Sequence, residues 1–403
     1  MAEGAHFDHQ PHADHGRIDD IEVLRAIAVG MVLVEHVRIN LITWVWGVHE
    51  PLYRVFGFWS GVDLFFAISG FVIARSLLPM LQDVCEPAEF LNVSLAFWVR
   101  RAWRLLPSAW LWLAVILVCA AAFNRSGAFE PLRSNIESVV AAVLNIANFR
   151  TVYILRKYPT GAAFPYWSLS LEEQFYLILP FLIFFTRRRL PWALLAIVAA
   201  QLFVKRSGPH SVVVLNMVRS DALCLGVLLA IWRSRPSYWR FEPRALRQDL
   251  IRILLPPTLI AVFALLSGNP YDPPRFQIGG VALAAAAIVW LASYDGDYFF
   301  PPGRLKQAFC WLGARSYAVY LIHIPAFFAT REIFFRLRPN VLTPSWAHLV
   351  LLLTTGLLVV LVLAELNYRF VERPLRAYGA GVAQRIRQRD LASLTATPEP
   401  VHV

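Results

Sequence analysis

The chain has 403 residues, of which 58% are hydrophobic and 16% are charged, and its mean hydropathy is +0.52. This composition excludes a soluble enzyme of the same size and predicts an integral membrane protein, because apolar runs near the length that crosses a bilayer recur along it. Its 38 basic residues exceed its 27 acidic residues. We interpret this excess mainly as a signal of membrane topology, with anionic lipid or a phosphorylated ligand as secondary interpretations and no indication of nucleic acid binding.

Ten apolar segments are predicted to cross the membrane as helices, which makes the fold class all-α, a polytopic membrane helix bundle. They lie near 21–41, 57–80, 104–123, 168–186, 190–204, 212–232, 252–268, 277–293, 308–330 and 346–366. The stretch 136–149 is apolar for only about a dozen residues and contains Asn145 and Asn148, so we expect a short re-entrant or interfacial segment there.

The basic residues are distributed unevenly between alternate loops. If ten spans start from a cytoplasmic N-terminus, the cytoplasmic loops carry most of the arginines, as the positive-inside rule requires. These loops contain Arg75, Arg100, Arg101, Arg104, the run 187–189 and the segments 233–252 and 369–389. We therefore expect a polar cytoplasmic tail over 1–20, a membrane domain over 21–378 and a second cytoplasmic tail over 379–403. The expected location is the cell membrane, as a multi-pass protein of the bacterial inner membrane type.

The first predicted span carries two ionisable residues, Arg25 and His36. Eleven residues at about 100° each make almost three turns, so the two side chains share a helix face and lie about 16 Å apart along the axis. The arginine is near the membrane edge and the imidazole is near the middle. Such residues inside a membrane segment are candidate functional groups, although an interhelical hydrogen-bonding pair that only stabilises the bundle is the alternative.

The second span contains GFWSGVDLFFAISGF, in which Asp63 and Ser69 interrupt an apolar run. Its glycines, Gly57, Gly61 and Gly70, permit close contact between helices. Close packing explains the glycines but does not explain a carboxylate within the membrane. We therefore include Asp63 and Ser69 among the candidate ligand-binding residues.

The third span begins with FWVRRAWRLLP, which places Arg100, Arg101 and Arg104 near the cytoplasmic surface. Arg101 and Arg104 are three residues apart and share one helix face beside the positive end of the helix dipole, an arrangement that favours phosphate. Anchoring of the helix by the positive-inside rule is the alternative for each arginine.

Two adjacent carboxylates, Glu172 and Glu173, follow Trp167 in the string WSLSLEEQFYLILP at the edge of the fourth predicted span. Their side chains point about 100° apart, so at most one of them faces lipid at low cost. Ser170 and Glu173 have the spacing of a capping box, which gives Glu173 a purely structural alternative at the start of a helix. Glu172 has no such alternative.

Polar residues recur in the last part of the chain. In MVRSDALCLG, Arg219 and Asp221 are two residues apart and cannot pair well with each other on a helix, so each needs a partner on another helix. The later string LGARSYAVYLIHIP places Ser316, Tyr320 and His323 on one helix face.

Two more residues of these late motifs are candidates for substrate contact or structural support. Tyr317 belongs to LGARSYAVYLIHIP, and Glu372 belongs to FVERPLR just outside the last predicted span. Taken singly, His323 is interpreted as a hydrogen-bonded packing residue, and Glu372 as a partner of a nearby arginine.

The motifs LRAIAVGMVLVEH, GVDLFFAISGF, FWVRRAWRLLP, WSLSLEEQFYLILP, RSDALCLG, LGARSYAVYLIHIP and FVERP, in this order over about 20 to 378, resemble those of the acyltransferase-3 family of membrane-bound O-acyltransferases. The resemblance implies ten spans with cytoplasmic termini. It also implies transfer of an acyl group, usually acetyl from acetyl-CoA, to sugar hydroxyls of polysaccharides, glycolipids, peptidoglycan or secreted metabolites, with no metal expected. Some members carry an extracytoplasmic hydrolase-like domain after the last span, which we do not expect here.

The resemblance also assigns roles to individual residues. Arg25 and His36 fall on the family's arginine-to-histidine motif, Arg101 and Arg104 on its RxxR motif, and Glu172 and Glu173 on its glutamate motif. Acyl transfer from a thioester to an alcohol needs a base, a stabilised oxyanion and contacts to the CoA phosphates. We expect His36 to be the base or a transient acyl carrier. The expected catalytic residues are His36, Glu172, Glu173 and Arg25; the expected donor-binding residues are Arg101, Arg104, Arg100, Ser69 and Asp63; the expected substrate or supporting residues are Trp167, Arg219, Asp221, Tyr317, His323 and Glu372.

Two other classes of protein fit part of the pattern. A polytopic carrier or flippase for a glycoconjugate or an acyl-CoA-derived group would also have buried charges along a translocation path. Against it, the sequence contains no pair of matching halves with broken helices in equivalent places. A non-catalytic acyl-CoA sensor would retain the arginines without needing His36.

Overall fold

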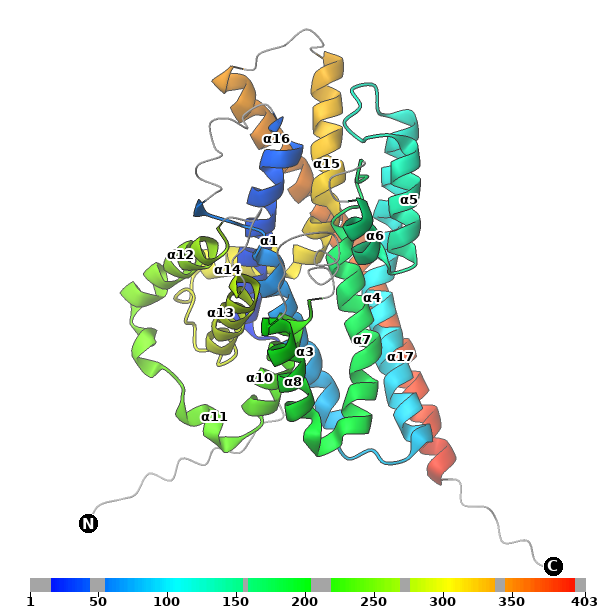
Figure 1. The fold of residues 1–403 in the computed structure, drawn as a ribbon, viewed down its shortest axis with the longest axis vertical. Helices are drawn as coiled ribbons and strands as arrows, with labels where there is room; N and C mark the ends of the chain where they lie inside the picture. The colour runs from blue at the N-terminus through cyan, green and yellow to red at the C-terminus, as the bar shows by residue number, and fades with distance from the viewer. Residues whose placement is uncertain are drawn as a thin grey trace, which may run out of the picture.

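The computed structural model of the chain describes residues 16–43, 55–154, 159–203, 219–268, 276–337 and 345–395. Every regular element in these residues is a helix, and the long helices form a bundle (Figure 1). Six of the described helices are long and apolar enough to cross a membrane. The predicted fold class, an all-α membrane bundle, is confirmed, whereas the predicted count of ten spans is not confirmed.

The helices are given in two groups, in chain order. The first group comprises α1 (Asp19–Asn40), α3 (Gly61–Leu81), α4 (Pro87–Ala122), α5 (Leu132–Val143), α6 (Ala147–Ile154), α7 (Tyr166–Thr186), η2 (Arg187–Arg189) and α8 (Leu190–Phe203). The second comprises α10 (Asp221–Arg233), α11 (Pro236–Arg240), η3 (Arg244–Arg247), α12 (Asp249–Leu266), α13 (Gln277–Ala292), α14 (Arg304–Ala314), α15 (Ser316–Leu337), α16 (Trp346–Asn367), η4 (Tyr368–Glu372) and α17 (Arg373–Thr395).

Three predicted spans differ from the helices that the chain forms. The span predicted over 104–123 is the second half of α4, which is 36 residues long and begins at Pro87, where a proline suits the first turn. The segment 308–330 is divided at Arg315 between α14 and α15. Of the segment 212–232, residues up to 218 lie outside the described residues, and the rest belongs to α10.

The last predicted span continues beyond its expected end. Together α16, η4 and α17 form one helical run over Trp346–Gln388 that is 43 residues long. This run crosses the expected boundary between 378 and 379, and α17 packs along α4 (Figure 1). The ring of Tyr378 lies 4.8 Å from that of Trp103, and Gly379 sits directly against the same tryptophan.

The stretch 136–149 forms parts of two short helices, α5 with 12 residues and α6 with 8 residues. At 1.5 Å per residue, α5 is about 18 Å long and cannot cross a hydrocarbon core of about 30 Å. The chain turns between the two helices at Asn145, which has a φ of 56°. This geometry agrees with the short re-entrant or interfacial segment that the sequence predicts.

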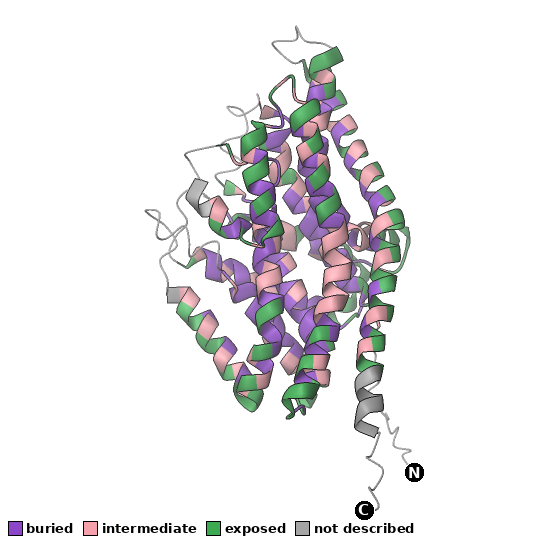
Figure 2. Cartoon of the chain, turned by 90° about the vertical axis from the view of Figure 1, so that its right-hand side faces the viewer, coloured by how far each residue is buried: buried purple, intermediate pink, exposed green. Residues whose placement is uncertain are grey.

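The helix α1 lies in the middle of the bundle, against α3, α13, α14 and α15. It contributes Leu24 and Met31 to a core shared with α3, α10 and α13, and Val29 to a second core shared with α4, α15 and α16. Figure 2 shows the same division, with buried residues along the centre of the bundle and exposed residues on its outer faces. Except for the exposed Asp19 at its start, the ionisable residues of α1 are therefore buried or partly buried among other helices.

The contact between α3 and α10 depends on glycine, as the sequence predicts. A Cβ atom at Gly70 would overlap the backbone carbonyl of Leu223, and one at Gly226 would overlap that of Ala67. Gly61 and Gly57 approach backbone carbonyls of Ala28 and Ser267 in the same way. Small residues at these positions let the helix backbones meet.

We expect Gly70→Ala to lower the free energy of unfolding by about 1–3 kcal/mol, because the added methyl group forces α3 and α10 apart. Gly30→Ala on α1 is the matched control, since nothing lies within 4 Å of its added methyl group. Thermal unfolding of both purified variants in detergent measures the difference. Equal midpoints for the two variants would contradict the close contact.

Candidate active site

A pocket with an empty volume of about 710 Å³ lies between α1, α3, α4, α7 and α15. Its polar lining comes from Arg25, Ser69, Arg101, Arg104, Ser168, Glu172, Tyr176, Ser316, Tyr317 and Tyr320. Apolar side chains such as Phe65, Phe66 and Leu105 complete the walls. Three guanidinium groups against one carboxylate make this pocket suitable for an anionic ligand.

The helix α4 supplies two of the arginines. Arg101 and Arg104 are one turn apart, and both line the pocket, as their shared helix face predicts. The guanidinium of Arg101 lies 5.1 Å from the ring of Tyr176 and 5.8 Å from the ring of Phe97. Arg100 precedes them on α4 but does not line the pocket, so the structure does not place it with the other two.

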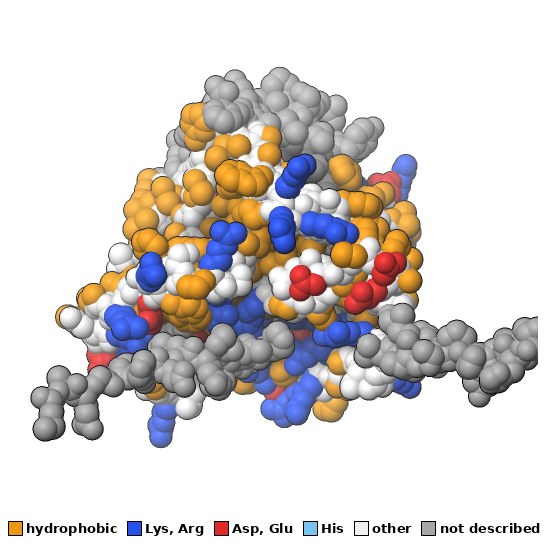
Figure 3. All heavy atoms as spheres, turned by 90° about the horizontal axis from the view of Figure 1, so that it is seen from below, with side chains coloured by type: hydrophobic (Ala, Val, Ile, Leu, Met, Phe, Trp, Pro, Cys, Tyr) orange, Lys and Arg blue, Asp and Glu red, His pale blue; other side chains and the backbone are white. Residues whose placement is uncertain are grey.

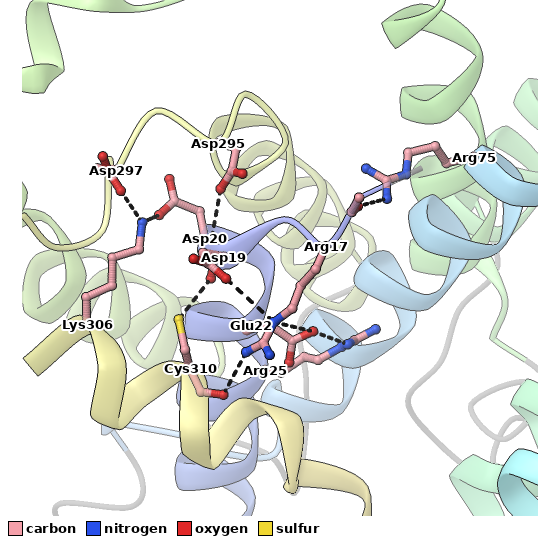
Figure 4. Close-up of polar contacts among 11 residues, drawn as sticks. Arg17, Asp19, Asp20, Glu22, Arg25, Arg75, Asp295, Asp297, Lys306 and Cys310 are labelled. Carbon is pink, nitrogen blue, oxygen red and sulfur yellow. Dashed lines mark hydrogen bonds and ion pairs between the residues drawn. The ribbon is translucent and has the colours of Figure 1, made fainter. Parts of the chain in front are cut away.

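The third arginine, Arg25, is oriented by its own helix. Its Nη1 donates to Glu22 Oε1 over 2.7 Å. Figure 4 shows Arg25 and Arg17 on either side of Glu22, and Arg17 Nε lies 4.0 Å from the same carboxylate oxygen. Glu22 therefore limits the rotation of Arg25, a role that no sequence motif indicates.

A second polar network anchors the start of α1 (Figure 4). Lys306 Nζ donates to Asp20 Oδ1 over 2.7 Å and also to Asp297. The backbone N–H of Tyr298 donates to the other oxygen of Asp20 over 2.9 Å. Burial works against the charged form of Lys306, but its bonds to Asp20 and Asp297 hold its pKa above the usual value. This network fixes the segment that carries Arg25 into the pocket.

The two glutamates of α7 face different spaces. Glu172 lines the main pocket and accepts a hydrogen bond from Tyr176 Oη, one turn later. Ser69 Oγ lies 2.5 Å from the same phenol oxygen. Glu173 instead lines a neighbouring pocket of about 500 Å³, with Asn145 at its edge. The predicted divergence of the two side chains explains this separation.

The capping-box interpretation of Glu173 is wrong. The helix α7 begins at Tyr166, so Ser170 is already inside the helix. Its hydroxyl accepts a hydrogen bond from the backbone N–H of Ala147 over 3.3 Å instead. Glu173 therefore has no capping role.

His36 forms a pair with His323 that the sequence analysis did not find. His36 Nδ1 lies 3.0 Å from His323 Nε2, and the ring centroids are 4.9 Å apart. His323 is fully buried, whereas His36 is partly exposed. These residues are 287 positions apart in the chain, so no local pattern indicates the contact.

The histidine pair adjoins the pocket through Tyr320. Neither histidine lines the pocket, but the Tyr320 ring does, and its centroid lies 5.6 Å from that of His323. Tyr320 Oη lies 2.6 Å from Ser168 Oγ and donates to the carbonyl of Pro165 over 3.1 Å. The predicted face of Ser316, Tyr320 and His323 thus connects the pocket to His36.

Asp63, Trp167 and Arg219 form a structural cluster beside the pocket. Arg219 Nη2 lies 3.2 Å from Asp63 Oδ2, and both side chains are almost completely buried. The same guanidinium lies 5.1 Å from the ring of Trp59 and 5.5 Å from that of Trp167. The expectation that Arg219 finds its partner on another helix is confirmed, whereas Asp63 does not line the pocket.

The remaining predicted residues have different surroundings. Tyr317 lines the pocket and donates to the carbonyl of Leu105 over 2.7 Å. Asp221 accepts from the backbone N–H of Ala222 over 3.2 Å at the start of α10. Glu372 is buried in η4 and does not line the pocket. Within the described ranges, no group of three or more His, Cys, Asp or Glu side chains could hold a metal ion.

A comparison of the whole sequence with known protein families identifies the class to which the chain belongs. The sequence model of the acyltransferase-3 family, described as an acyltransferase domain, matches residues 18–365. The chain belongs to this family. It is thus a multi-pass membrane protein of the acyltransferase class, and the match covers every helix that lines the pocket.

Three curated O-acetyltransferases resemble the chain over most of its length. YrhL of Bacillus subtilis, provisionally named a peptidoglycan O-acetyltransferase, is 28% identical over 384 residues, which cover 91% of this chain and 56% of YrhL. The peptidoglycan O-acetyltransferase OatA of Listeria monocytogenes is 27% identical over 90% of this chain and 56% of its own length. The O-acetyltransferase OatA of Staphylococcus aureus is 25% identical over 89% and 57%.

The chain spans only a little over half the length of these curated relatives. No solved structure matches it.

Proposed function

We propose that the chain is a membrane O-acetyltransferase that moves an acetyl group from acetyl-CoA to a glycan hydroxyl. The observation that carries the proposal is the pocket in which Arg25, Arg101 and Arg104 converge, with Tyr320 in its wall next to the histidine pair. The names of YrhL and of Listeria OatA support a peptidoglycan-like glycan as the acceptor.

The pocket suits the CoA donor in charge, because Arg25, Arg101 and Arg104 line it. Guanidinium groups bind phosphate oxygens through paired N–H donors, and CoA carries a diphosphate and a ribose phosphate. We assign the phosphates to Arg101 and Arg104 and the thioester to the end of the pocket near Tyr320.

His36 is the base or the transient acyl carrier in this proposal. As a base, it takes the proton of the glycan hydroxyl while the hydroxyl oxygen attacks the thioester carbonyl carbon; the C–S bond breaks and the CoA thiolate then receives a proton. As a carrier, its imidazole nitrogen first attacks the thioester carbonyl carbon, and the C–S bond breaks to release the CoA thiolate. The glycan hydroxyl then attacks the acetyl carbon, displaces the imidazole and passes its proton to the thiolate or to the imidazole. Arg25 stabilises the oxyanion or a CoA phosphate.

We place the donor side and both termini in the cytoplasm. Support comes from the lower end of the bundle, where the connection between α7 and α8 and the end of α17 lie (Figure 1). Seen from below, this face carries many lysine and arginine side chains and few acidic ones (Figure 3). That asymmetry is typical of a cytoplasmic membrane surface.

The direct test is acetyl transfer by the chain in lipid vesicles. With acetyl-CoA and peptidoglycan fragments, an acetyltransferase releases the free CoA thiol and forms O-acetyl esters in equal amounts. A carrier or flippase releases no thiol. Absence of both products with glycans of several classes would overturn the proposal.

The two glutamates of α7 should respond differently to the same substitution. We expect Glu172→Gln to lower the acetyl transfer rate by on the order of 10²-fold, because it removes the negative charge from the pocket and weakens the hydrogen bond from Tyr176. Glu173→Gln is the matched control on the neighbouring position, and its effect should be at most about tenfold, since Glu173 faces the other pocket. Steady-state rates of thiol release measure both. A larger loss for Glu173→Gln would contradict this assignment.

A further inference from the structure

The hydrogen bonds of the histidine pair have a defined direction. His323 Nδ1 lies 2.7 Å from the backbone carbonyl oxygen of Tyr320. A carbonyl oxygen can only accept, so His323 Nδ1 must carry a proton. If His323 Nδ1 carried a lone pair instead, that lone pair would face one on the carbonyl oxygen of Tyr320, and the two would repel.

The position of that proton decides the state of the second nitrogen. His323 is fully buried, and a charged imidazolium there would have lost its hydration, so the neutral ring is the consistent state. A neutral ring protonated on Nδ1 has a lone pair on Nε2. This Nε2 lies 3.0 Å from His36 Nδ1. Because it has no proton, it can only accept the hydrogen bond between the two rings. His36 Nδ1 therefore carries the proton of that hydrogen bond.

We infer that His323 is a positioning residue that holds His36 in the tautomer protonated on Nδ1 and leaves His36 Nε2 with a free lone pair. This inference rests on the proposed function of His36 for its consequence in acetyl transfer. The carbonyl of Tyr320 sets the state of His323, and His323 sets the state of His36.

The consequence concerns the atom that takes part in transfer. Nε2 of His36 is the nitrogen that accepts the hydroxyl proton or attacks the thioester carbonyl carbon. In the opposite tautomer this nitrogen carries a proton and can do neither. His36 is also the less buried member of the pair, whereas His323 is fully buried.

Two substitutions separate positioning from packing. His323→Gln retains an acceptor, because its amide oxygen can take the place of Nε2. His323→Leu fills a similar volume but offers no acceptor to His36. A residue that only packs tolerates leucine at least as well as glutamine, whereas a positioning residue requires glutamine.

Nitrogen NMR of the full chain in lipid bilayers tests the tautomer without any measurement of activity. With ¹⁵N-labelled histidine, protonated and unprotonated ring nitrogens give well-separated signals, and loss of a signal in His36→Gln or His323→Gln assigns it. We expect His36 to be protonated on Nδ1 in the wild type and in His323→Gln, and to lose this preference in His323→Leu. A wild-type His36 protonated on Nε2 would overturn the inference.

Steady-state kinetics test the consequence. His323→Leu should lower kcat by at least about 10²-fold with KM for acetyl-CoA changed by less than about threefold, and His323→Gln should recover most of the lost rate. Equal activity of the leucine and glutamine variants would assign His323 to packing alone. If the wild type showed the expected tautomer but no acetyl transfer with any acceptor, the proposed function would fail while the positioning role stood.

Discussion

Replacing His36 with alanine should lower the rate of acetyl transfer by about 10²–10⁴-fold, the range that a general base contributes. The imidazole is the partly exposed member of the histidine pair, and its removal eliminates the nitrogen that accepts the hydroxyl proton or carries the acetyl group. Release of the CoA thiol in the presence of a glycan acceptor measures the rate. Binding of acetyl-CoA should change little, because His36 does not line the pocket.

His348→Ala is the matched control for this variant. His348 lies in the first turn of α16, and its ring contacts Phe334. It does not line the pocket, and no catalytic role is assigned to it. Its removal should leave the transfer rate within about twofold of the wild type. Appreciable turnover by well-folded His36→Ala protein would remove His36 from the mechanism.

Replacing both Arg101 and Arg104 with alanine should produce the largest loss of donor affinity. Each lost charge-assisted hydrogen bond costs about 1.5–3 kcal/mol, which corresponds to about 10–100-fold in the dissociation constant of CoA. Titration calorimetry with purified protein and CoA measures the change. Lysine at either position should recover only part of the affinity, because an ammonium group cannot donate two parallel N–H bonds to a phosphate.

Arg100→Ala provides the control for the arginine variants. Arg100 lies on the same helix, directly before Arg101, but it does not line the pocket. If Arg100→Ala weakened CoA binding as much as Arg101→Ala, the arginines of α4 would act by anchoring the helix in the membrane rather than by contact with the donor. If neither changed binding, the assignment of the donor to this pocket would be wrong.

Local spacing predicted the parts of the site that lie on a single helix. Arg101 and Arg104 were expected to share a face, and both line the pocket. Glu172 and Glu173 were expected to diverge, and they line different pockets. Helical geometry relates side chains a few residues apart whatever surrounds the helix, so these relations follow from residue spacing alone.

For contacts between helices, the sequence predicts only that a buried polar residue needs a partner, and it does not predict which residue that partner is. Arg219 needed a partner on another helix, and the structure supplies Asp63 on α3. His323 was interpreted as a packing residue, yet it bonds His36 across 287 positions of the chain. Glu22, Asp20 and Lys306 orient the start of α1 without any motif that indicated such a role. Many polar residues could satisfy each buried group, and periodicity does not select one of them.

The sequence by itself determined the membrane class, the helical fold and the faces on which the polar residues lie, because hydrophobicity and helical periodicity act along the chain. The tertiary structure alone decided where helices begin and break, as at Tyr166 in α7 and at Arg315 between α14 and α15. It also decided that three arginines from α1 and α4 share one pocket and that His36 meets His323. These relations depend on how the helices pack, and packing is set by the shape complementarity of whole helix faces. The glycines of α3 could be read from the sequence as sites of close contact, but not which helix each of them meets.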